Sequence, residues 1–295
     1  MKLSTLFLSG VAFGLMAVPA AATEAPPPAH NPPACQPAAG ECVGSDQVPF
    51  IQNEQIQLSS SFAGYDLVAD DIGSAAGASA ASANLLTASA QNASGLIIET
   101  VQGAFGTTTA ETTMDVGHAA GAVVNTTAAT ANGLTVTTDT TAQTLNATQV
   151  VHEGADVNAW SYTRSQNVYA AANAASAGGN VTTIHGANSG VDARIVQNSG
   201  ANIRATAEAD HCCVRTAATG TAIASANNIT GASTGGGPAV VSTDQRSSGR
   251  EVVALVDLYI GFTGDALANS SANGNATTYG GAFVPREFNV TQVNT

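Results

Sequence analysis

The distribution of proline restricts the fold of this 295-residue chain more than any other feature of its sequence. Six of its ten prolines fall between Pro26 and Pro37, and from Phe50 to Gly237 the sequence contains none. Proline has no amide N–H to donate, so central β-strands exclude it. A long proline-free region therefore suits a continuous β-ladder, although a disordered chain rich in Ala, Ser and Thr would also lack proline.

Short clusters of β-branched residues recur in this region between small polar residues. We expect strands at 96–101, 134–138, 181–184, 191–196, 202–206 and 221–224. The pairs Asn132-Gly133, Gly179-Asn180 and Ser199-Gly200 are typical of turns and are expected to separate strands. Strand centres between Val168 and Ile223 are roughly 10 to 14 residues apart, a spacing typical of all-β folds. Residues 74–93 are rich in Ala and Ser, which suits either a helix or a β-coil of small residues.

Large apolar side chains are scarce, and a globular sandwich of this length would need a thicker core. We therefore predict an all-β fold whose body is an elongated, right-handed β-solenoid or β-helix of short strands. The predicted divisions are a signal peptide (1–22), a Pro-rich N-terminal linker with Cys35 and Cys42 (23–49), a Thr/Ala/Asn/Gly-rich β-repeat body (50–250), and an apolar strand with a C-terminal cap (251–295).

The first 22 residues have the layout of a secretory leader. Lys2 supplies the positive charge, residues 3–18 form the apolar segment, and small residues precede Thr23. Ser9, Gly10 and Gly14 interrupt the apolar segment, so it favours a cleaved leader over a membrane anchor. We expect the mature chain to be exported.

Charge excludes several classes of partner. The chain has 8 Lys and Arg against 21 Asp and Glu, a formal net charge of −13. Nucleic acids and anionic lipids need basic clusters, which are missing, so neither is expected to bind. Sheet edges are commonly protected by lysine and proline, and the only lysine is Lys2. We hypothesise that one end of the fold stays open and pairs with another copy or a partner subunit; alternatively, negative charge keeps the protein monomeric.

Export also permits disulfides. The four cysteines, Cys35, Cys42, Cys212 and Cys213, allow three pairings, of which a short Cys35–Cys42 loop closes at the lowest entropy. Asp210 and His211 precede the adjacent cysteines, but neighbouring cysteines rarely present both sulfurs to one tetrahedral metal ion.

The most apolar segment of the mature chain lies near its C-terminus. Its apolar residues are Val252, Val253, Leu255, Val256, Leu258 and Ile260. This segment is interpreted either as a buried closing strand or as an assembly strand that docks another subunit.

No catalytic motif is present in the sequence. His152-Glu153 with Asp156, and Asp115 with His118, place imidazoles near carboxylates, but neighbours on a strand point to opposite faces. The acidic residues Asp66, Asp70 and Asp71 lack the spacing of an EF-hand loop. We therefore expect no enzyme activity and no catalytic, cofactor-binding or metal-binding residues.

One alternative is a β-helical polysaccharide lyase or hydrolase. Its nearest candidate residues are Asp192, Arg194, Arg204 and Glu208, with Trp160, Tyr162 and Tyr169 as aromatic contacts for sugar.

The layout as a whole resembles a known family. A leader, a Cys-bearing Pro-rich start, a Thr/Ala/Asn/Gly-rich body, Cys212-Cys213 and an apolar segment near the C-terminus resemble the holdfast-anchor protein D family of stalked, surface-attaching bacteria. The resemblance implies a non-enzymatic protein, secreted to the outer cell surface and associated with the outer membrane, that anchors an adhesive polysaccharide.

The same resemblance implies particular partners. These are the polysaccharide, a curli-like subunit and an outer-membrane secretion lipoprotein, with the chain itself as a homo-oligomer or polymer. A fimbrial or autotransporter-like adhesin is the main alternative.

Overall fold

The computed structural model describes residues 48–295, except 236, 250 and 283–285. These residues form strands and connecting turns without a helix, which confirms the all-β prediction. The strands are β1 (Phe50–Gln57), β2 (Ser61–Ile72), β3 (Ala75–Gln91), β4 (Leu96–Ala104), β5 (Thr108–Asp139), β6 (Gln143–Val151), β7 (Asp156–Ala187), β8 (Val191–Ser199), β9 (Asn202–Thr234), β10 (Ala239–Ser247), β11 (Val252–Ala282) and β12 (Arg286–Asn294). The predicted leader, the linker, Cys35 and Cys42 lie outside the described residues.

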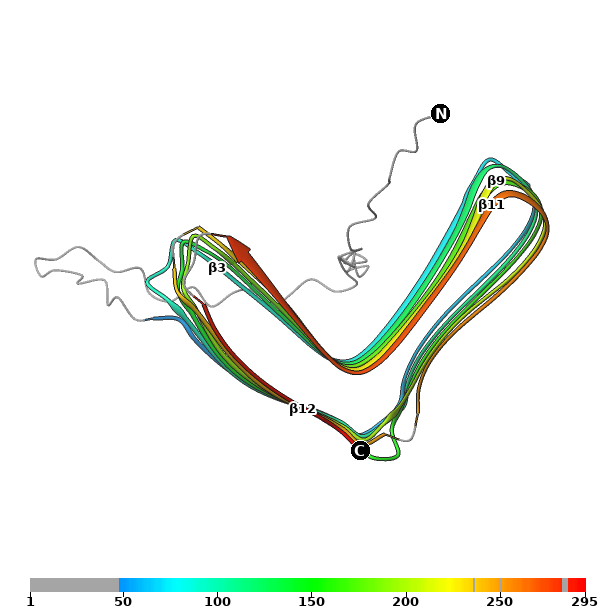
Figure 1. Ribbon diagram of the computed structural model, residues 1–295. Coiled ribbons are helices and arrows are strands. Elements are labelled where there is room, and N and C mark those ends of the chain that lie inside the picture. The colour runs from blue at the N-terminus through cyan, green and yellow to red at the C-terminus, as the bar shows by residue number, and fades with distance from the viewer. Residues whose placement is uncertain (1–47, 236, 250, 283–285) are drawn as a thin grey trace, which may run out of the picture. The chain divides into compact units, whose positions relative to one another are not determined.

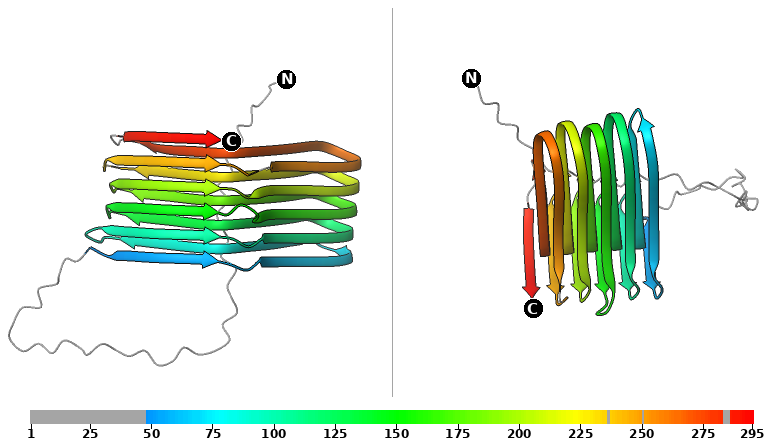
Figure 2. Two further views of the ribbon diagram at one scale, coloured as in Figure 1. Left: turned by 90° about the horizontal axis from the view of Figure 1, so that it is seen from below. Right: turned by 90° about the vertical axis from the view of Figure 1, so that its right-hand side faces the viewer.

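Short and long strands alternate along the chain and form two parallel sheets. The short-strand sheet has the order β1-β4-β6-β8-β10-β12. The long-strand sheet has the order β11-β9-β7-β5, and both β2 and β3 pair with β5. We call a short strand together with the long strand that follows it a coil; in the first coil, β2 and β3 together make the long strand. Figure 2 shows the coils stacked in chain order.

Each coil repeats the register of the one before it. Asn132 pairs with Asn180, 48 residues on, and Asn180 with Asn227, 47 residues on. Figure 1, which looks along the stack, shows successive coils superposed. Connections between parallel strands therefore never have to cross.

The long strands bend back on themselves. The Thr127 hydroxyl donates to the Thr112 hydroxyl at 2.8 Å, so the two halves of the outer part of β5 face each other. Near the bend the register shifts between Ala119 and Ala122. Gly121 donates its N–H to Gly73 O at 2.6 Å, and a Cβ there would lie 2.2 Å from the Ser74 hydroxyl, so this bend requires glycine.

The six predicted strands all lie within observed strands, but the expectation of uniformly short strands was wrong. β5 and β7 have 32 residues each, because small side chains and a register shift let one strand bend without a turn. Of the Ala/Ser-rich residues 74–93, for which either a helix or a β-coil was expected, Ala75–Gln91 form β3.

The core is thin and built largely from alanine. We call the part of the body where each long strand bends back on itself the arm. One cluster, near the base of the arm, consists mostly of Ala, with Val151, Val157 and Ile203. Larger side chains, including Ile98, Leu134, Leu145 and Ile195, fill the space between the short strands and the last part of the long strands. A third cluster, with Met114, Val116 and Val123, fills the tip of the arm. Small residues allow the two layers to approach closely, so few large apolar side chains are needed.

Two ladders of buried amides run along the stack. In the asparagine ladder, each Nδ2 donates to the Oδ1 of the next coil at 2.7–2.8 Å, through Asn84, Asn132, Asn180, Asn227 and Asn275. In the glutamine ladder, each Nε2 donates to the Oε1 of the preceding coil at 2.7–2.9 Å, through Gln55, Gln102, Gln149, Gln197, Gln245 and Gln292. The amides thus satisfy one another inside the core.

Two of the pairs that were predicted to form turns lie inside strands instead, as part of the asparagine ladder. Asn132-Gly133 lies inside β5 and Gly179-Asn180 inside β7. Each ladder asparagine also donates to a short-strand carbonyl, as Asn132 does to Val150 O at 2.9 Å. Its amide therefore ties the two sheets together, and this buried network outweighs the local preference of Asn-Gly for a turn. Ser199 ends β8, and Gly200 follows outside it, as expected.

Candidate functional site

The first and last coils leave sheet edges unpaired within the described part of the chain. β1, β2 and β3 lie at one end of the two sheets, and β11 and β12 at the other. Most of the exposed large apolar side chains lie at these two ends. They are Val48, Phe50, Ile56, Leu58, Phe62, Tyr65, Val68 and Leu85 at the start of the stack, Leu255, Tyr259, Phe262 and Leu267 on β11, and Phe288, Val290 and Val293 on β12. Such edges offer both backbone groups and apolar surface to another chain.

The predicted assembly strand forms the start of β11. Val252 and Val256 pack against the alanine-rich cluster, and Ile260 packs against the cluster at the tip of the arm. Leu255, in contrast, is 50% exposed. β11 pairs with β9 along one edge, and its other edge has no partner strand among the described residues. The segment therefore contributes side chains to the core and also leaves one row of backbone groups free to pair.

An aromatic pair marks the outer face of the long-strand sheet. The rings of Trp160 and Tyr162 on β7 stack with centroids 6.0 Å apart and an interplanar angle of 17°. A shallow groove of about 500 Å³ runs beside Trp160, and its polar lining comes from Thr109, Glu111, Asn158, Arg204, Thr206 and Glu208. Three neighbouring coils thus contribute to one groove that combines an aromatic surface with hydroxyl, amide and charged groups.

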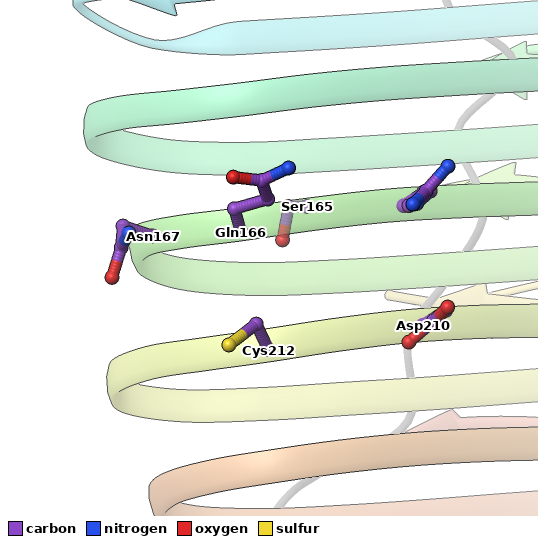
Figure 3. A pocket seen from close by; sticks show the side chains of 6 residues that line it. Ser165, Gln166, Asn167, Asp210 and Cys212 are labelled. Atoms are coloured by element: carbon purple, nitrogen blue, oxygen red, sulfur yellow. The ribbon is translucent and has the colours of Figure 1, made fainter.

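A second groove lies near the bend of the long strands. It measures about 310 Å³ and is lined by Arg164, Ser165, Gln166, Asn167, Asp210 and Cys212 (Figure 3). Cys212 and Cys213 are free thiols whose sulfurs lie 3.0 Å apart. A hydrogen bond with Cys212 raises the pKa of the Cys213 thiol, so Cys213 forms the reactive thiolate less readily than an ordinary thiol does.

His211 directly precedes these two cysteines on β9, and its side chain points into the core. Its side chain is fully buried, its Nδ1 lies 2.7 Å from the Ser165 hydroxyl, and its Nε2 has no hydrogen-bond partner. Burial lowers the pKa of His211 to about 4, although the Asp210 carboxylate acts in the opposite direction. The imidazole is therefore neutral at physiological pH.

This histidine predicts acid-sensitive stability. The unfolded chain takes up a proton at His211 near pH 6.5 and the folded chain only near pH 4, so stability falls as pH falls between these values. The expected loss is about 3 kcal/mol. Urea unfolding of the wild type and of His211→Val, measured at pH 7 and pH 4.5, checks this. The variant should lose much less stability than the wild type over this pH range, and an equal loss in both proteins would contradict the role of His211.

Other predicted constellations are not brought together by the fold. His152 is exposed, stacks on Phe105 at 4.9 Å and lies 2.6 Å from Glu153 O through Nδ1. Asp156 instead accepts a hydrogen bond from Asn202. Asp115 faces Arg164 at 3.9 Å, so its partner is that arginine rather than His118.

The candidate residues of a lyase are divided between the sheets. Asp192 and Arg194 lie on β8, whereas Arg204 and Glu208 lie on β9 and line the groove beside Trp160. Arg204 is 3.7 Å from Glu251. Tyr169 is exposed near the bend, outside the residues that line the Trp160 groove.

Neither a metal cluster nor a membrane helix occurs in the part of the chain that the structure describes. Among these residues, no three His, Cys, Asp or Glu side chains, including those of Asp66, Asp70 and Asp71, are placed to share a metal ion. Within the same residues, no helix is long and apolar enough to cross a membrane.

Comparison with known proteins gives one match. The model of the family described as holdfast attachment protein D matches residues 69–295, most of the chain. No curated protein and no solved structure matches. The matched region contains the second to fifth coils and the last strand, so the laddered stack is where the similarity lies.

Proposed function

Because the chain belongs to the holdfast attachment protein D family, we propose that it is a non-enzymatic structural protein that anchors an adhesive polysaccharide to the cell envelope. The family match across the stacked coils carries this proposal. A stack of parallel strands crossed by amide ladders resists local opening, which suits a protein that must bear load. Its localisation would be the outer cell surface, in association with the outer membrane.

The coiled body is best interpreted as a right-handed β-solenoid. Every strand pairs in parallel with the strand one coil away, and parallel strands joined by a crossover are right-handed in almost all known cases. In the exported protein, a cleaved leader and a Pro-rich linker would precede this body, and the segment from Glu251 onward would close it.

The groove beside Trp160 is the surface we propose for polysaccharide contact. Aromatic rings pack against the C–H faces of sugars, while hydroxyl, amide and charged groups fix orientation through hydrogen bonds. Asn158, Thr206 and Arg204 supply such groups in this groove. Because its lining spans three coils, an extended chain of sugar units could lie along the stack.

The open end coils support the assembly part of the proposal. Assembly would proceed through the β11 segment defined by Val252, Val253, Leu255, Val256, Leu258 and Ile260, with other copies or with the curli-like subunit and secretion lipoprotein that the family resemblance implies. The cysteines Cys35, Cys42, Cys212 and Cys213 remain candidates for disulfides in the exported protein.

Deletion of the gene in the source bacterium tests the anchoring role. A fluorescent lectin should show polysaccharide still being made but released into the medium, because the link to the envelope is missing. Re-expression of the wild-type chain should return the lectin signal to the cells. Polysaccharide that remains on the deletion strain would contradict the proposal and favour an adhesin role, in which adhesion is lost without release of polysaccharide.

A further inference from the structure

The described stack begins and ends with a short strand, so it contains a whole number of coils plus half a coil. Among the described residues it contains six short strands and five long ones, when β2 and β3 are counted together. In this part of the chain, β12 adds a short strand beyond β11 that no long strand follows. A second copy therefore cannot place its β1 on β12 and its β2 and β3 on β11 at once, because one long strand between them would be missing.

β12 occupies the same columns of side chains as β1. Following the register through the short-strand sheet, Gln292 lies in the column of Gln55, Val293 in that of Ile56, and Phe288 in that of Ile51. β1 and β12 are the two edges of one sheet and carry side chains of the same kind in these three columns, although Phe50 and Asn53 of β1 align with Glu287 and Val290 of β12. β12 thus occupies the register that the first strand of a second copy would take.

The contacts of β12 reproduce those of a following coil. Gln292 Nε2 donates to Gln245 Oε1 at 2.7 Å, which continues the glutamine ladder. Asn275 Nδ2 donates to Asn294 Oδ1 at 2.7 Å and to Val293 O at 2.9 Å. In the interior, Asn227 makes the same two bonds to Asn275 Oδ1 and Arg246 O. Asn294 therefore supplies the acceptor that the asparagine of a further coil would supply.

We propose that β12 is an exchangeable cap whose place on β10 is taken by β1 of a second copy. The incoming β2 and β3 would then pair with the free edge of β11, and the half-coil mismatch would vanish. Gln55 of the second copy would donate to Gln245, and Asn275 would donate to Asn84 of the second copy. Each ladder bond that β12 gives up is thus replaced, and the long edge of β11 gains a partner in addition.

The ladders also fix the direction of assembly. Glutamine Nε2 groups point toward the first coil, and asparagine Nδ2 groups point toward the last. If the first coils of two copies met, the Gln55 Nε2 donors of both copies would face each other, and so would the Asn84 Oδ1 acceptors. Head-to-tail contact alone pairs donors with acceptors, and a head-to-tail contact that does not close produces a filament.

This inference rests on the assembly part of the proposed function and names its partner, a second copy. Two repulsive contacts oppose it. The register would place Asp66 of the second copy beside Asp257, and both are exposed. It would also place Glu54 of the second copy beside Asp244, where Thr291 of β12 lies in the monomer. Assembly is therefore best measured at about 1 M salt, where the Debye length is about 3 Å.

A reversible lock on β12 tests the exchange. Ser242 and Asn289 are register partners on β10 and β12, so Ser242→Cys with Asn289→Cys should form a disulfide that holds the cap. The full chain also carries Cys212→Ser and Cys213→Ser, and its unlocked parent shows any effect of reductant alone. By sedimentation velocity and electron microscopy, the oxidised protein should stay monomeric and the reduced protein should form rods. Equal assembly in both states, or none after reduction, would overturn the proposal.

Two matched substitutions give a second readout. Gln292→Ala weakens the cap without altering the incoming strand, so assembly should be at least tenfold faster. Gln55→Ala alters the incoming strand but not the cap, so assembly should be at least tenfold slower. Effects in the same direction would contradict exchange. If exchange fails while the deletion strain still sheds polysaccharide, anchoring stands without self-assembly; if exchange succeeds while polysaccharide stays on the cells, the anchoring role is the part that fails.

Discussion

Asn180→Ala should lower the free energy of unfolding by about 4 kcal/mol. Asn180 is fully buried, accepts from Asn132 Nδ2 and donates to Asn227 Oδ1 and Asn198 O, all at 2.8–2.9 Å. Alanine leaves those two acceptors without their donor inside the core, at about 1–3 kcal/mol each. It also opens a small cavity between the sheets. Urea denaturation followed by circular dichroism measures the loss.

Asn167→Ala is the matched control for this substitution. Asn167 lies on the same strand, β7, but its side chain is exposed near the bend. The same chemical change should alter stability by no more than about 0.5 kcal/mol there. If the two variants unfold at the same urea concentration, the asparagine ladder contributes nothing to stability and the structural account of the core is wrong.

Thr183→Pro should destabilise the stack by at least about 3 kcal/mol. Thr183 is in the interior of β7 and pairs with Thr135 on one side and Thr230 on the other. Proline removes an N–H from a parallel ladder whose strands are paired on both edges, and its fixed φ opposes the extended backbone. The expected result is loss of the cooperative thermal transition near the wild-type melting temperature.

Gly190→Pro separates the ladder effect from a general effect of proline. Gly190 precedes β8 at the register position that Pro238 occupies before β10 in the next coil. A Cβ there would meet Pro238 O at an ordinary 3.5 Å. This variant should keep wild-type stability or gain up to about 1 kcal/mol, because proline restricts the unfolded chain. Equal damage from both prolines would contradict the ladder as the reason for the proline-free region.

The presence of strands could be predicted from the sequence, because their cause is local. β-branched clusters such as 134–138 and 191–196 fix extended backbone wherever they occur. The absence of proline between Phe50 and Gly237 restricts the chain in the same residue-by-residue way. Fold class therefore followed from composition and short patterns.

The ladders and the repeat could not be predicted in that way, because their cause is non-local. Asn132-Gly133 has the local chemistry of a turn, and only the presence of Asn84 and Asn180 one coil away makes it part of a ladder. A search for amides repeating every 47 or 48 residues would have found Asn84, Asn132, Asn180, Asn227 and Asn275. The Trp160 groove could be predicted only in part. Trp160, Arg204 and Glu208 were among the candidate sugar-site residues, whereas Thr109, Glu111 and Asn158 join them only because the coils stack.

The most direct test asks whether the folded stack of coils anchors the polysaccharide. It measures how much polysaccharide is retained by cells that carry a stable or a destabilised version of the chain. The deletion strain would express the wild type, Asn167→Ala or Asn180→Ala, and lectin fluorescence on cells would be compared after shear, with surface protein measured by immunoblot. We expect retention with the wild type and with Asn167→Ala, and release into the medium with Asn180→Ala. Equal retention in all strains, including the one with no copy of the gene, would show that the chain does not anchor the polysaccharide.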